Sequence, residues 1–140
     1  MKKFSITSVV EERHIDKGGH ANFALQLLIA AHALEEFRKT GAIGIERLRE
    51  DYDIFLFMRR ILFVEYYREL FLHDVIQVEL EIDTDGPCTL KCSCKILRGT
   101  VVATEMQWVM VTASPSTKRP KRIPTRMREI IRQPVPPATT

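Results

Sequence analysis

Two stretches in the second half of the chain alternate between apolar and polar side chains, a third strand-like stretch follows them, and a fourth before them is apolar apart from Arg59-Arg60. Residues 75–83 show the clearest alternation, with Ile76, Val78, Leu80 and Ile82 set against Gln77, Glu79, Glu81 and Asp83. A period of two predicts a β-strand with one buried face. Turn residues at 85–87 and 98–100 separate this strand from strands at 88–97 and 101–112, and residues 54–64 predict a strand before them. We therefore expect four antiparallel strands.

The first third of the chain predicts one strand and one long helix. Residues 4–13 have moderate strand character, residues 14–20 break it with Gly18-Gly19, and residues 21–39 have helical character up to Gly41. Apolar side chains leave no wide polar stripe on this helix, so it must be surrounded. The expected fold class is α+β, with one antiparallel sheet curled around one long buried helix.

The expected core domain covers residues 1–114, and a basic, Pro-rich segment covers residues 115–140. That segment holds six of the seven prolines, a short helix predicted at 125–132 after Pro124, and an end expected to be disordered. From residue 113 onward there are seven basic side chains and one acid, so the overall charge of +3 conceals a body with a charge of −3. The tail could be solvated or could add cations for the phosphate groups of a ligand. Nucleic acid is the least favoured partner, because no aromatic residues are interleaved.

The cysteines and the apolar segments bear on the compartment. Cys88, Cys92 and Cys94 alternate with polar residues and lack metal-knuckle spacing, so we expect small core side chains in a reducing cytoplasm, with no metal site. The longest apolar segment, residues 23–34, is far shorter than the roughly 20 residues that a bilayer span needs. No apolar targeting segment follows Lys2-Lys3. We expect a cytoplasmic protein with no membrane partner.

The break before the helix carries the candidate chemistry. Asp16 is followed by a flexible glycine pair and then by a helix start, whose unpaired amides favour negative charge. Asp16 could act as a general base or a nucleophile toward a carbonyl that those amides polarise. The alternative is that Asp16 only caps or solvates the helix start.

The element Asp16-x-x-Gly19-His20-x-Asn22 resembles that of hot-dog-fold thioesterases, in the 4-hydroxybenzoyl-CoA thioesterase-like family. The resemblance extends to about residue 131. It includes Arg38-Lys39-Thr40-Gly41 at the end of the helix, Tyr66 at the end of a strand and Asp74 at the start of the next one. It also includes Gly99 in a hairpin turn and Ile123-Pro124 before the final helix. It implies hydrolysis of an acyl thioester of CoA or of acyl carrier protein, in a homodimer or homotetramer. No cofactor is implied, and CoA is part of the substrate.

The resemblance also implies roles for individual residues. Asp16 and His20 are the expected catalytic residues, with Gly19 and His20 supplying amides near the carbonyl and Asn22 supporting the loop. Tyr66 is expected to line the site. The pair Arg59-Arg60, in an otherwise apolar strand, is expected to meet either an acid on a neighbouring strand or a CoA phosphate at the dimer seam.

The chain departs from the family pattern at four positions. His14 stands where many members carry an acid two residues before the catalytic one, and Gln26, Ala31 and His32 occupy helix positions that are often acid or tyrosine. His32 is expected to be a core histidine with one hydrogen bond. Two alternatives therefore stay open: a non-catalytic acyl-CoA-binding protein, and a 3-hydroxyacyl-thioester dehydratase.

Overall fold

The computed structural model describes residues 2–19, 21–39 and 48–132. Its elements, in chain order, are β1 (Lys2–Val9), the short 3₁₀ helix η1 (Glu12–His14), α1 (Phe23–Lys39), α2 (Leu48–Tyr52), β2 (Phe55–Tyr66), β3 (Val75–Thr84), β4 (Thr89–Arg98), β5 (Val101–Ala113) and α3 (Thr125–Arg132). The expectations for His20, for the helix stop at Gly41 and for the last eight residues lie outside the described residues.

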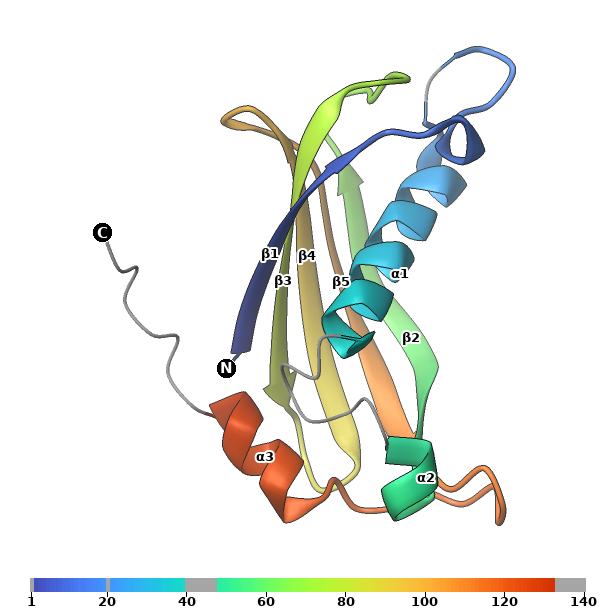
Figure 1. The fold of residues 1–140 in the computed structure, drawn as a ribbon, viewed down its shortest axis with the longest axis vertical. Coiled ribbons are helices and arrows are strands. Elements are labelled where there is room, and N and C mark those ends of the chain that lie inside the picture. Colours follow the sequence, from blue (N-terminus) through green and yellow to red (C-terminus); the bar gives the residue numbers. More distant parts are fainter. Residues whose placement is uncertain (1, 20, 40–47, 133–140) are drawn as a thin grey trace.

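The five strands form one antiparallel sheet in the order β1-β3-β4-β5-β2. The sheet curls, and α1 lies along its concave face (Figure 1). The alternate residues of β3 and β4 that the sequence assigns to one face are buried, including Ile76, Leu80 and Ile96. They form the core with buried residues of α1 such as Ile29 and Ala33. The predicted α+β class is confirmed.

The first strand is shorter than predicted, because its partner ends. The ladder between β1 and β3 stops at the pair Val9–Val75, after which the N–H of Val10 bonds to the C=O of Asp74 (3.0 Å). Residues 12–14 then turn into η1 and carry the His14 side chain into the interior. The expectation of a strand over residues 10–13 is therefore wrong.

Strand β2 forms one edge of the sheet, and much of it is exposed. Among the described residues it pairs only with β5, and two irregularities interrupt that pairing, between Met58 and Arg60 and between Ile61 and Phe63. Each shift leaves one extra residue on β2, first Arg59 and then the residue after Ile61. Large apolar side chains on this strand are open to solvent, with Met58 55% exposed.

The C-terminal helix occupies its predicted range and covers the rim of the sheet below β1 and β3 (Figure 1). Ile123, Met127 and Ile131 are spaced four residues apart and are all buried in the core. Arg128 donates to the carbonyl oxygens of Gly86 (3.0 Å) and Pro87 (3.3 Å) and so holds the β3–β4 turn. The described part of the basic segment is therefore packed against the sheet.

The three cysteines are free thiols on the inner side of β4 and just before it. Burial raises the pKa of the Cys92 and Cys94 thiols to about 12. Cys92 and Cys94 are inert core side chains, as the alternation predicts, whereas Cys88 is only half-buried. Within the described ranges, no helix is long and apolar enough to cross a membrane.

Candidate active site

A tight turn places Asp16 ahead of α1. The N–H of Gly19 donates to the C=O of Asp16 (3.0 Å), and Gly19 adopts a φ of +82°. This left-handed backbone conformation favours glycine, so the turn predicted from the Gly18-Gly19 pair is confirmed. A methyl group added at Gly19 would meet no atom within 4 Å. The glycine is therefore required for its backbone angle and not for lack of space.

The Asp16 carboxylate is oriented by a donor on each side. Its Oδ1 accepts the N–H of Gly18 (2.8 Å), and its Oδ2 accepts the Nδ2–H of Asn22 (3.3 Å). Asn22 in turn accepts the N–H of Leu25 through Oδ1 (3.1 Å). Asn22 is therefore the N-cap of α1, and Asp16 is held beside the helix start without capping it.

Two further bonds fix the start of α1 to the rest of the fold. The N–H of Ala21 donates to the C=O of Leu70 (2.7 Å), in the loop after β2. Gln26 is buried, and its Nε2 donates to the C=O of Ala21 (3.0 Å) while its Oε1 accepts the hydroxyl of Thr104 on β5. The sequence alone predicts no role for Gln26 in the site. It shows only an amide side chain in an apolar helix segment, at a position that departs from the family pattern.

The register places Tyr66 at the same end and on the same face of the sheet as the helix start. Tyr66 is opposite Thr104 in the β2–β5 ladder, and Thr104 contacts Gln26 in the first turns of α1. Tyr66 is 42% exposed, and its partial burial raises the pKa of the phenol. Its hydroxyl is therefore neutral near pH 7 and able to donate a hydrogen bond.

The predicted site residues fall into two groups. Asp16, Gly19 and Asn22 are brought together in the loop before α1, whereas Tyr66 and the exposed Arg59-Arg60 pair lie along the edge strand β2. His20 lies outside the described residues, so its predicted role stays a prediction.

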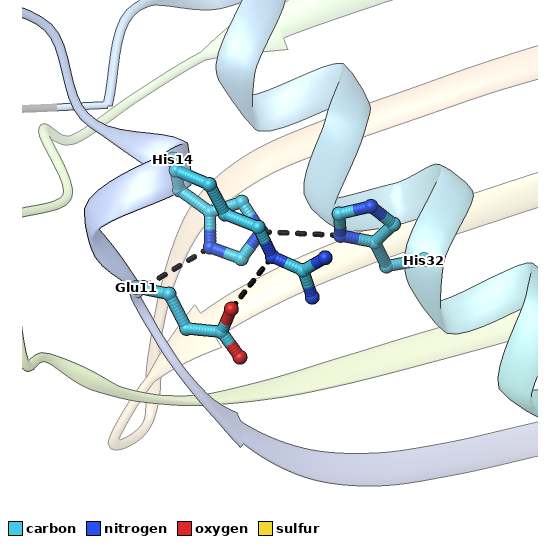
Figure 2. A network of polar contacts seen from close by, with 4 residues as sticks. Glu11, His14 and His32 are labelled. Atoms are coloured by element: carbon cyan, nitrogen blue, oxygen red, sulfur yellow. Dashed lines mark hydrogen bonds and ion pairs between the residues drawn. The ribbon is translucent and has the colours of Figure 1, made fainter.

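Two histidines form a buried contact next to this loop (Figure 2). His14 Nε2 lies 3.2 Å from His32 Nδ1, and His14 Nδ1 accepts the N–H of Glu11 (3.1 Å). Burial, followed by the charge of Arg13, lowers the pKa of His14. His32 makes one hydrogen bond, as expected, but it is half-buried and not part of the core. Its partner is the residue that stands in place of the family's acid.

A hollow of about 710 Å³ is lined by residues of α2 and of the segment that leads into α3. Figure 1 shows these two helices at the opposite end of the sheet from the start of α1. The hollow is lined by both signs of charge, with Glu50 and Asp51 on one side and Lys121, Arg122 and Arg126 on the other. In the part of the chain that the structure describes, no cluster of three His, Cys, Asp or Glu side chains is placed to hold a metal ion.

The sequence matches no family model and no curated protein. Solved structures do resemble the fold. A 1,4-dihydroxy-2-naphthoyl-CoA thioesterase from Synechocystis superposes with a TM-score of 0.80 at 15% identity, over 93% of this chain and 96% of that one. A hypothetical protein from Staphylococcus aureus in complex with CoA gives 0.80 at 22% identity, over 93% and 82%. A Thermus thermophilus thioesterase complexed with CoA and zinc gives 0.75 at 24% identity, over 92% and 97%.

These similarities, together with the strand order and the helix on the concave face, show that the chain has the hot-dog fold that the sequence predicts.

Proposed function

We propose that this protein is a thioesterase, which hydrolyses an acyl thioester to a free acid and a thiol. The observation that carries the proposal is the Asp16 carboxylate, held by Gly18 and Asn22 at the start of α1. Support comes from the fold, since similar structures are described as thioesterases or as complexes with CoA.

In the proposed reaction Asp16 is the general base. It takes a proton from a water molecule as the water oxygen attacks the thioester carbonyl carbon. The carbonyl oxygen gains negative charge, which backbone N–H groups at the start of α1 stabilise. The N–H of Gly19 already donates to the C=O of Asp16. The N–H groups of Phe23 and Ala24 have no acceptor within the helix, so they are the proposed donors to the carbonyl oxygen. When the C–S bond breaks, the proton passes from Asp16 to the leaving thiolate.

The proposal includes a homodimer joined along β2. One chain leaves Met58 and Ile61 exposed on that edge strand, and the register turns both toward the face that bears α1. On α1, Ala24 and Ala31 are exposed and Leu28 is only half-buried, although the sequence predicts a surrounded helix. A second copy that adds its own β2 would cover these apolar side chains and remove the open edge.

The proposed substrate is an acyl thioester of CoA or of acyl carrier protein. Arg59 and Arg60 are exposed on β2, so in the proposed dimer they would flank the seam, where guanidinium groups suit the phosphates of either carrier. The three free thiols support a reducing compartment and hence the cytoplasm.

Steady-state kinetics on a panel of acyl-CoA esters tests the proposal. Asp16→Asn keeps an acceptor for the Gly18 N–H but removes the base, so we expect kcat to fall by about 10²-fold or more. Glu129→Gln makes the same acid-to-amide change on the exposed face of α3 and should leave kcat unchanged. Equal turnover by Asp16→Asn and the parent would overturn the assignment of Asp16. Saturable acyl-CoA binding without turnover by the parent would favour the non-catalytic alternative.

A further inference from the structure

A pair of imidazoles joins the segment that precedes Asp16 to the middle of α1. His14, the last residue of η1, is only 3% exposed, and its Nε2 lies 3.2 Å from Nδ1 of His32 on α1. The second ring nitrogen of His14 accepts the backbone N–H of Glu11 at 3.1 Å. Figure 2 shows the two rings facing each other between η1 and α1.

These contacts fix where the proton sits. A backbone N–H can only donate, so Nδ1 of His14 is the acceptor and the proton of the neutral ring is on Nε2. His14 therefore donates through Nε2 to Nδ1 of His32. The same tautomer leaves Nε2 of His14 without a lone pair for a metal ion, which argues against a metal between the two rings.

The two bonds respond differently to a second proton on His14. That proton would have to occupy Nδ1, which would expel the Glu11 N–H, whereas Nε2 would still donate to His32. Both bonds therefore form together only when His14 is neutral.

Asp16 lies between two attachments to α1. On one side, His14 is bonded to His32; on the other, Asp16 is bonded to the N-cap residue Asn22. The intervening residues make a turn whose own bonds, from Gly18 and Gly19 to Asp16, are local and move with it. Without the histidine pair, the segment just before Asp16 would lose its side-chain hydrogen bond to α1.

We infer that His14 is a positioning residue for Asp16, and that its hydrogen bond to His32 is a latch between the catalytic loop and α1. The inference rests on the proposed function for the role of Asp16, whereas the latch itself can be measured without turnover.

The surroundings of the pair keep His14 neutral. Burial disfavours the imidazolium of His14 and so lowers its pKa, Arg13 and His32 add repulsion, and the Glu11 carboxylate opposes them in part. Glu11 is itself paired with Arg13 at 2.6 Å, and on α1 the carboxylate one turn beyond His32, that of Glu36, is paired with Lys39 at 3.8 Å. Near neutral pH His14 is therefore the neutral ring that accepts from Glu11 and donates to His32.

Two substitutions at His32 distinguish loss of the hydrogen bond to His14 from loss of the imidazole ring itself. His32→Asn keeps an acceptor oxygen near the place of Nδ1 but cannot be protonated, whereas His32→Leu fills similar space with no acceptor. We expect His32→Leu to lower kcat by about tenfold at pH 8 with KM changed by less than about twofold, because binding groups elsewhere are intact. His32→Asn should keep kcat within about threefold of the parent, because it restores the acceptor for His14.

The ring nitrogens provide a readout that does not need catalysis. In ¹⁵N–¹H spectra of the whole protein, His14 should show a protonated Nε2 and an unprotonated Nδ1 near neutral pH, and His32→Leu should shift both. If His14 carries its proton on Nδ1, or if His32→Leu retains the kcat of an active parent, the inference is wrong. If the parent turns over no thioester while the ring signals show the described tautomer and its change in His32→Leu, the proposed function fails and the latch stands.

Discussion

The side chain of Asn22 serves Asp16 and the helix at once: Nδ2 donates to the Asp16 carboxylate at 3.3 Å, while Oδ1 accepts the Leu25 N–H at 3.1 Å. One residue thus couples the start of α1 to the orientation of the proposed base. Because the two bonds use different atoms, substitutions at this position can remove one and keep the other.

Asn22→Ser should separate helix capping from catalysis. Serine keeps an N-cap oxygen but is too short to reach Asp16 as the amide does, so stability should stay within about 0.5 kcal/mol while kcat falls. Asn22→Ala removes both bonds and should also lower the free energy of unfolding by about 1 kcal/mol. Urea unfolding and kinetics on each variant make the comparison, and full activity in Asn22→Ser would show that the amide bond is dispensable.

Gly19→Ala should destabilise the turn through backbone strain. The added methyl group meets no atom within 4 Å, but the φ of +82° is unfavourable for alanine, so we expect a loss of about 1 kcal/mol. Gly99 is the matched control, with a φ of +63°, equal space and a place in the β4–β5 hairpin. Gly99→Ala should cost similar stability and leave kcat unchanged, whereas Gly19→Ala should lower kcat as well.

Ile61→Glu should prevent the proposed dimer from forming. In a dimer along β2, the new carboxylate would be buried or brought near its own symmetry mate, which costs several kcal/mol. Val75→Glu adds the same charge at an exposed apolar position on β3 and should leave association unchanged. Sedimentation velocity distinguishes the two. A monomeric parent would remove the dimer from the proposal.

The thiols should differ in reactivity. Burial raises the pKa of Cys92 and Cys94 to about 12, so neither forms appreciable thiolate near pH 8. Cys88 is half-buried and should be the one thiol that reacts with a disulfide reagent in the folded protein. All three should react in urea, and prompt reaction of more than one thiol under native conditions would contradict the burial.

The stability of the protein should fall with acid over a window set by His14. Its pKa is lowered below 6.5 in the folded state, so the unfolded chain binds more protons between the two values. The contribution is complete above pH 6.5 and is lost as the pH falls toward the folded value. His14→Gln keeps a donor toward His32 without titrating, so its unfolding midpoint should change less than that of the parent between about pH 7.5 and 5.5.

Local patterns were sufficient to predict most of the fold. Alternation in β3 and β4 follows from the geometry of a single strand, and the spacing of Met127 and Ile131 follows from a single helix, so each is visible in a short window. The turn at Gly19 and the Asp16 position were likewise accessible, because both belong to one segment of seven residues.

What the sequence could not predict depends on contacts between distant segments. Strand β1 ends at Val9 because β3 begins at Val75, which no window around Val9 contains. The bonds from Gln26 to Thr104 and from His14 to His32 likewise join side chains that only the folded sheet and helix bring together. Helix α2 is five residues long, too short for a helical period to be recognised.

The strand order also has a consequence for how the chain folds during synthesis. Within residues 2–19, 21–39 and 48–132, β1 pairs only with β3 and β2 pairs only with β5, so these two strands have no sheet partner until the second half of the chain has been made. Until β3, β4 and β5 have been made, the apolar side chains of α1 lack the strands that they pack against. We expect slow folding dominated by long-range pairing, and dependence on chaperones while the nascent chain is incomplete.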